Sequence, residues 1–99
     1  MRMYQYTLLK QDGTVEDLGV SKKKKFRELY KILQCNMIEL IPTIYYENHG
    51  RCSMYGDEEG RFKAKNIRNP HFKVIKDAEG RDWDVVGDII KERVYKGNK

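Results

Sequence analysis

The chain has 99 residues and a formal net charge of +5, and 35% of its residues are charged against 39% that are hydrophobic. This length provides one core and excludes a second domain, and no apolar run reaches the roughly 18 residues of a membrane span. The first residues also lack the apolar centre of a signal peptide, so we expect a single domain over residues 1–99 that stays in the cytoplasm.

The N-terminal residues predict a β-hairpin. Residues 3–10 are rich in β-formers and alternate tyrosine and leucine onto one face, which is typical of a half-buried strand. Asp12-Gly13 is a strong hairpin signal, and residues 15–20 then return as the second strand.

A helix over residues 22–34 is the clearest predicted element. Ser21 can cap its first turn through the hydroxyl oxygen, and Asn36 can take the left-handed conformation that ends a helix. Apolar residues recur at i, i+3, i+4 and i+7 and form one stripe. They are Phe26, Leu29, Tyr30 and Leu33. We expect this helix to pack on one face of a small, mostly antiparallel sheet, which makes the fold class α+β.

The middle of the chain predicts short extended segments separated by turns. These segments are residues 37–41, 43–47, 51–55 and 61–65. Asn48-His49-Gly50 is one turn, and the acidic stretch between Gly56 and Gly60 is another. The acidic stretch is therefore predicted to be the tip of a hairpin.

The C-terminal third gives weaker signals. Asn69-Pro70 suits the start of a short helix, although Val74-Ile75 suits a strand equally well. After a turn at residues 77–82, a dense set of β-branched residues predicts a strand over residues 83–91. Residues 95–99 predict a frayed basic tail.

The chain carries no catalytic or metal-binding motif of a common type. Cys35 and Cys52 are too few for a disulfide framework, so we expect two free thiols. His49 lacks the paired cysteines of a structural zinc site, and the acidic residues 57–59 lack the spacing of a calcium loop. We therefore expect no metal, no cofactor and no catalytic residue. An enzyme that uses the acidic turn is the remaining alternative, and it requires a carboxyl group in a pocket with a raised pKa.

The positive charge favours an anionic partner or an acidic protein surface. The candidate contact residues are the cations of two clusters and one aromatic ring. They are Lys22, Lys23, Lys24, Lys25, Arg61, Lys63, Lys65, Arg68 and Tyr55. Basic grooves lined with aromatic rings suit single strands or nucleotides, whereas a charge run can also be a solvated face.

Four short motifs follow one another in the second half of the chain. They are an apolar strand with an acidic residue, an acidic turn that ends in glycine, an Asn-Pro pair, and a closing strand entered through Gly-Asp, at residues 37–41, 57–60, 69–70 and 85–90. In this order they resemble a family of short proteins of phages and mobile elements that is known only as a domain of unknown function. His71 and Phe72 depart from the family pattern, which often has small apolar residues after Asn-Pro.

The resemblance implies a genomic context and no particular chemistry. It predicts a phage or mobile-element protein that acts in the cytoplasm of a host cell. Together with the missing catalytic motifs, it predicts a non-catalytic accessory protein that binds a host or defence component, either a protein or a nucleotide messenger. The alternative is an accessory protein that binds nucleic acid through its basic clusters. The oligomeric state stays open, a homodimer included.

Overall fold

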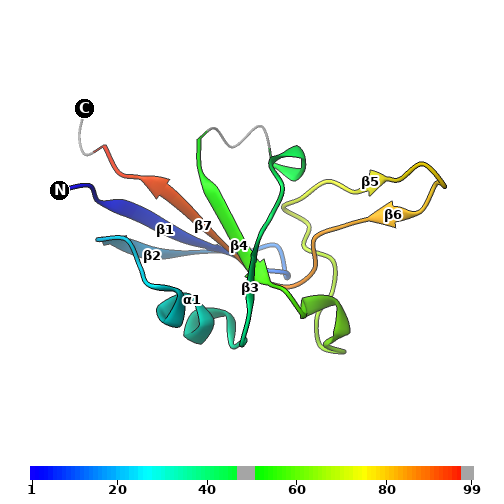
Figure 1. The fold of residues 1–99 in the computed structure, drawn as a ribbon, viewed down its shortest axis with the longest axis horizontal. Coiled ribbons are helices and arrows are strands. Elements are labelled where there is room, and N and C mark those ends of the chain that lie inside the picture. Colours follow the sequence, from blue (N-terminus) through cyan, green and yellow to red (C-terminus); the bar gives the residue numbers. More distant parts are fainter. Residues whose placement is uncertain (47–50, 97–99) are drawn as a thin grey trace.

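The structure is a computed structural model that describes residues 1–46 and 51–96. Five antiparallel strands form one sheet in the order β2-β1-β7-β4-β3, with one α-helix against it (Figure 1). The strands are β1 (Tyr4–Leu9), β2 (Val15–Ser21), β3 (Ile38–Leu40), β4 (Ser53–Asp57) and β7 (Ile89–Val94), and the helix is α1 (Phe26–Leu33). The predicted α+β class is confirmed, and so is the N-terminal hairpin.

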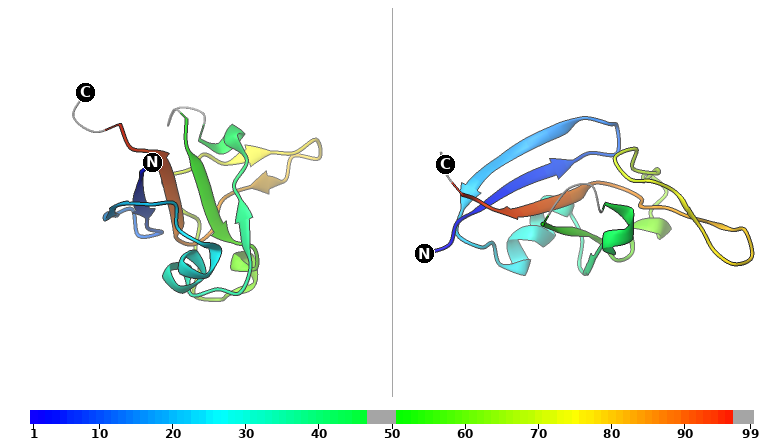
Figure 2. Two further views of the ribbon diagram at one scale, coloured as in Figure 1. Left: turned by 60° about the vertical axis from the view of Figure 1, so that its left-hand side comes forward. Right: turned by 90° about the horizontal axis from the view of Figure 1, so that it is seen from above.

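A separate two-stranded hairpin pairs β5 (Ile75–Lys76) with β6 (Asp82–Trp83). It projects from one end of the main sheet, as two further views show (Figure 2). The described residues consequently extend 46 Å along their longest axis but only 27 and 21 Å along the others. The predicted turn at residues 77–82 is the tip of this hairpin.

The sheet is apolar on both faces, because alternate residues of each strand point to opposite sides. On the helix side, Leu29 of α1 packs on Tyr6, Leu8, Tyr55 and Ile90. On the other side, a second cluster contains Leu9, Met54 and Ile89 from the strands and Ile41, Tyr46, Phe72 and Val85 from the connections. The connecting segments therefore cover one apolar face of the sheet, and α1 covers the other.

The helix begins four residues later than predicted, at Phe26. Ser21 does not cap it, because Ser21 is the last residue of β2 and its hydroxyl donates to the carbonyl of Lys22. Residues 22–25 instead form the connection between β2 and α1, where the backbone N–H of Lys24 donates to the hydroxyl of Tyr6 at 2.8 Å. Cations at a helix start are disfavoured by its dipole, which agrees with their exclusion from α1. Gln34, with φ of 54°, takes the left-handed position predicted for Asn36.

Two predicted extended segments are wrong. Residues 43–45 form a short 3₁₀ helix, Thr43–Tyr45, that starts after Pro42; Glu47 and the predicted turn at residues 48–50 lie outside the described part of the chain. Residues 60–62 form another 3₁₀ helix, Gly60–Phe62, and a turn follows it. The side chain of Asn66 donates to the carbonyl of Gly60 at 2.9 Å and holds this turn closed. The acidic stretch thus leads from β4 into a turn, and is no hairpin tip.

The short helix predicted after Asn69 is also absent, because Asn69 serves a different purpose. Its side chain is fully buried, and its Nδ2 donates to the carbonyls of Leu9 and Gly87, both at 2.8 Å. Its Oδ1 accepts the N–H of His71 at 2.9 Å. Asn69 therefore joins the end of β1, the loop before β7 and its own turn.

The predicted closing strand is interrupted. Residues 82–83 belong to the projecting hairpin, and the ladder of the main sheet resumes only at Ile89. Gly87 lies between them at φ of +82°, a backbone conformation that suits glycine. Here the sequence signal for extended structure was right, but it covered two strands of different sheets.

A buried polar network joins β1, β4 and β7 to the residues before α1, on the sheet face that the helix covers. Glu92 is 4% exposed, and its carboxylate accepts hydrogen bonds from the hydroxyls of Tyr6 and Tyr55 at 2.7 and 3.1 Å. Lys23 Nζ forms an ion pair with the same carboxylate at 2.9 Å. Burial raises the pKa of Tyr6, and the neighbouring carboxylate adds to the rise. Burial likewise raises the pKa of Tyr55.

These pKa values predict a loss of stability in alkali. A group whose pKa is raised by folding stabilises the fold below its unfolded pKa, about 10 for tyrosine, and loses this effect as pH rises through the folded value. We expect the urea concentration at the midpoint of unfolding to decrease as the pH is raised from about 8 to about 11. Tyr6→Phe should be less stable at the lower pH, because it loses two hydrogen bonds, and should show a smaller fall. Equal falls in both proteins would contradict a neutral phenol at Tyr6.

Among the described residues, no helix is both long enough and apolar enough to cross a bilayer.

Candidate functional site

The basic cluster at residues 61–68 is largely occupied by internal contacts. Arg61 pairs with Asp84 through Nη1 and Oδ1 at 3.2 Å, and Lys63 Nζ lies 2.5 Å from Asp57 Oδ2. Arg68 donates to the carbonyl of Phe72 at 3.1 Å. Lys65 alone of these four predicted contact residues is exposed without a side-chain partner among the described residues. The cluster holds the turn after β4 together.

The four lysines at residues 22–25 lie at the other end of α1. Lys23 pairs with Glu92, and the Nζ of Lys24 lies 5.2 Å from the centre of the Tyr6 ring. With Arg27 they surround a shallow, open concavity of about 530 Å³. Lys63, by contrast, donates to the carbonyl of Gln34 just beyond the end of α1. The structure therefore does not bring the two predicted basic clusters together.

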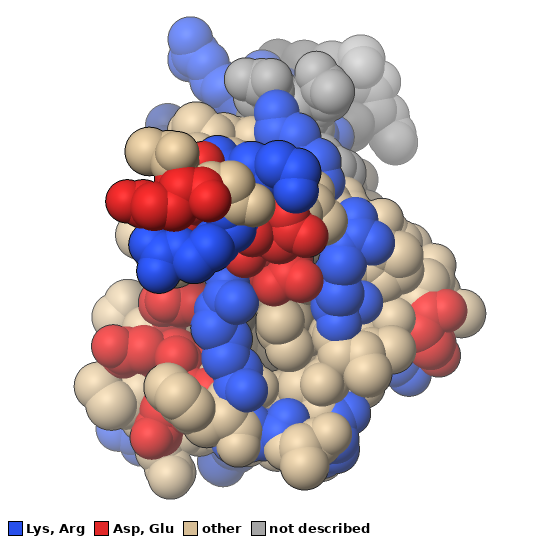
Figure 3. Space-filling model, turned by 90° about the vertical axis from the view of Figure 1, so that its right-hand side faces the viewer, with Lys and Arg blue, Asp and Glu red and all other residues tan. Residues whose placement is uncertain are grey.

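Tyr55 cannot serve as a stacking platform. It is 6% exposed and belongs to the core on the helix side. The acidic and basic side chains at the end of the molecule where the hairpin projects are interspersed, with no single sign dominating (Figure 3).

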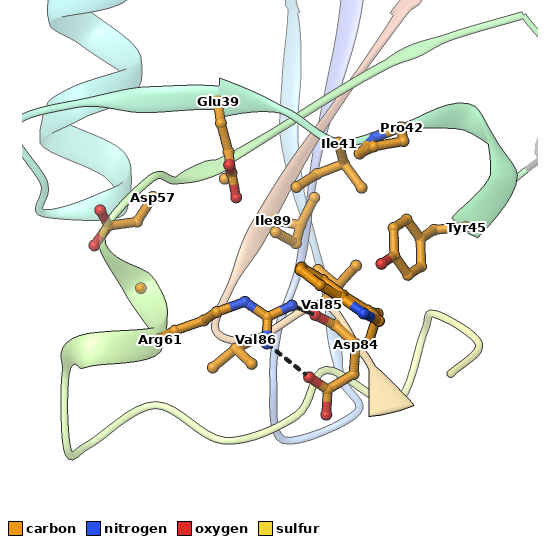
Figure 4. A pocket seen from close by; sticks show the side chains of 13 residues that line it. Glu39, Ile41, Pro42, Tyr45, Asp57, Arg61, Asp84, Val85, Val86 and Ile89 are labelled. Carbon is orange, nitrogen blue, oxygen red and sulfur yellow. Dashed lines mark hydrogen bonds and ion pairs between the residues drawn. The ribbon is translucent and has the colours of Figure 1, made fainter. Parts of the chain in front are cut away.

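A cavity of about 190 Å³ lies on the sheet face opposite the helix, between β3, the two 3₁₀ helices and β6. We call it the Trp83 pocket (Figure 4). Its floor is apolar, and its walls carry two aromatic rings, Arg61 and three carboxylates. The floor contains Ile41, Val85 and Ile89, the rings are Tyr45 and Trp83, and the carboxylates are Glu39, Asp57 and Asp84.

The ring of Trp83 is held in place although it is 49% exposed. Its Nε1 donates to Asp77 Oδ2 at 3.0 Å, and this hydrogen bond is the main reason why the pKa of Asp77 lies below its usual value. On the other side, the Cζ of Arg61 lies 5.7 Å from the ring centre, in the range of a cation–π contact. Arg61 is itself fixed by Asp84. The aromatic wall is therefore formed before any ligand arrives.

Glu39 is the one lining carboxylate without a partner among the described residues. It stands opposite Gly56 in the β3–β4 pairing, and its side chain points into the pocket between Asp57 and Ile89. Partial desolvation raises its pKa, and the nearby charge of Glu58 adds to the rise. Asp57 and Asp84 are both ion-paired, so the lining keeps one uncompensated negative charge.

Gly56 shapes the floor through its missing side chain. A Cβ at this position would lie 2.8 Å from Cδ1 of Ile89 and 3.2 Å from Cδ1 of Ile41. Both distances are shorter than ordinary carbon–carbon contacts. Any larger residue would push these floor residues, so the glycine sets the depth of the pocket.

The structure gives little support to a reactive cysteine, a metal site or a catalytic carboxylate in the acidic turn. Burial raises the pKa of both free thiols, Cys35 and Cys52, which disfavours the reactive thiolate. No three potential metal ligands gather anywhere in residues 1–46 and 51–96. In the acidic turn, Glu58 and Glu59 are exposed and Asp57 is paired with Lys63. The lining carboxyl group whose pKa is raised is that of Glu39, outside the acidic turn that the enzyme alternative invoked.

Of the residues that build this pocket, the sequence analysis identified Arg61 as a contact residue but not Glu39 or Trp83, and it did not predict that they meet. Glu39, Tyr45 and Trp83 are far apart in the chain and carry no shared motif. Two signals were present: an acidic residue inside an apolar strand, and a lone tryptophan in a segment expected to be an ordinary strand. No protein-family model, curated protein or solved structure matches this chain.

Proposed function

We propose that this protein is a non-catalytic accessory protein of a phage or mobile element that binds a host or defence protein through the Trp83 pocket. The preformed pocket carries the proposal. It combines an apolar floor, a fixed and half-exposed tryptophan, and an arginine, which are the features of a binding hot spot. The four motifs that resemble short phage proteins support the host context.

The size and charge of the pocket favour a protein partner over a nucleotide messenger. Its volume of about 190 Å³ lies below the roughly 300–1,000 Å³ of sites that enclose a small-molecule ligand. Its uncompensated charge is negative, which repels phosphate groups. A single side chain of a protein partner matches both the small volume and the negative charge of the pocket.

The surroundings of the pocket add apolar surface for such a partner. Ile44 is 55% exposed between the lining residues Pro42 and Tyr45, and Phe62 is 87% exposed beside Arg61. An apolar rim around a deep anchor excludes water from the contact. The nucleic-acid alternative has weaker geometry, because its two basic clusters lie at opposite ends of α1 and one of them is internally paired.

A selection of random linear peptides against the folded protein tests this proposal. We expect peptides that bind wild type and lose at least about tenfold in affinity with Trp83→Ala, the usual cost of removing a hot-spot aromatic residue. Phe26→Ala is the matched control, since Phe26 is also an exposed aromatic residue, at 60%, but lies on α1. A selection that yields no peptide sensitive to Trp83→Ala would refute the proposed function.

A further inference from the structure

The unpaired carboxylate of Glu39 limits which partner side chains can cover the Trp83 pocket. Glu39 has neither a hydrogen bond nor an ion pair with the described residues, while the other acids of the lining are matched by Arg61 and Lys63. A partner that covers the pocket removes the remaining water from this carboxylate. Burying an unpaired charge is strongly unfavourable unless a counter-charge or hydrogen-bond donor replaces the water.

Resting on the proposed function, we propose that the partner inserts a lysine or arginine side chain into the Trp83 pocket and places its cationic end on Glu39. The apolar stem would lie on the floor formed by Ile41, Val85 and Ile89. Long cationic side chains bury their methylene groups in this way while the charged end finds a polar partner. Charge-assisted contacts to a carboxylate are among the stronger hydrogen bonds of proteins.

The aromatic walls favour the same occupant. Trp83 and Tyr45 are the rings of the lining, and the faces of such rings attract cations. Trp83 already holds Arg61 at 5.7 Å in this manner. Because Asp84 neutralises Arg61, a second cation near Glu39 meets a balanced pair and not a bare positive charge.

Other occupants satisfy the pocket less well. An apolar anchor would fill the floor but leave Glu39 buried without a partner. An acidic anchor or a phosphate would add repulsion to that cost.

The single tryptophan of the chain provides a direct reporter. The indole N–H resonance of Trp83 can be followed by NMR while acetylated, amidated tripeptides are added, in which glycine flanks arginine, lysine, glutamine or norleucine. We expect saturable shifts with the arginine or lysine peptide at an affinity at least about tenfold above that of the glutamine and norleucine peptides, the range of a hydrogen bond to a charged group.

Glu39→Gln should remove this preference and leave the other resonances in place. Glu16→Gln is the control, because it changes the total charge equally from an exposed position on β2, at the opposite edge of the sheet. Equal binding of the neutral peptides, no shift with either cationic peptide, or a preference that survives Glu39→Gln would each overturn the inference.

The two proposals fail in different ways. If selected peptides depend on Trp83 but contain no basic residue and tolerate Glu39→Gln, the cationic anchor is wrong and the pocket remains a binding site. If no selected peptide depends on Trp83, the proposed function itself falls.

Discussion

Asn69→Asp should bring the protein close to unfolding at neutral pH. The substitution keeps the size of the side chain but replaces the Nδ2 donor with an acceptor that faces two backbone carbonyls, of Leu9 and Gly87. The site is fully buried, and the hydrogen-bond partners of the side chain are uncharged backbone groups. An uncompensated buried charge costs about 3–5 kcal/mol, which is a large part of the roughly 5–15 kcal/mol that stabilises a typical domain.

Chemical denaturation of Asn69→Asp and Asn69→Ala side by side separates charge from lost hydrogen bonds. The alanine variant loses the Nδ2 donor and the Oδ1 acceptor without adding a charge, at about 1–3 kcal/mol for each unsatisfied partner. The aspartate variant should recover stability relative to wild type as pH falls toward about 4, because protonation removes the charge that burial disfavours. An aspartate variant within about 1 kcal/mol of wild type at neutral pH would contradict the role assigned to Asn69.

Leu29→Ala should cost about 2–5 kcal/mol, because Leu29 is 1% exposed and is the fully buried contact of α1 with the sheet. Phe26→Ala should cost less than about 0.5 kcal/mol, because Phe26 is 60% exposed. The contrast is informative because both residues belong to the same apolar stripe, and phenylalanine is the larger side chain.

Urea denaturation followed by circular dichroism measures both variants against wild type. If the whole stripe were buried, as the pattern alone predicts, Phe26→Ala would be the more damaging change. A cost for Phe26→Ala equal to that for Leu29→Ala would therefore show that the helix packs differently from the arrangement described above.

The sequence predicted those elements whose causes are local. The N-terminal hairpin follows from alternation and Asp12-Gly13, and the helical stripe follows from spacing within α1. The start of the helix could not be found in this way. It depends on contacts of residues 23 and 24 with Glu92 and Tyr6, which lie far away in the chain.

The same reason explains the error at Asn69. By propensity, an asparagine before a proline suits a helix start. Here, however, two tertiary hydrogen bonds, to the carbonyls of Leu9 and Gly87, and one local hydrogen bond from His71 occupy its side chain. The Trp83 pocket was beyond prediction because Glu39, Tyr45, Arg61 and Trp83 come from four separate segments. Arg61 was predicted to contact a partner, and it does line the pocket, although as part of an ion pair.

The position of β7 has a consequence for synthesis in the cell. This strand comes last in the main sheet by sequence but lies at its centre, between β1 and β4. When the nascent chain has been synthesised as far as Phe72, it contains the strand pairs β1–β2 and β3–β4 but not β7, the strand that pairs with both. Folding must therefore wait for residues 89–94, and until then the unpaired edges of β1 and β4 are open to chaperones and to aggregation.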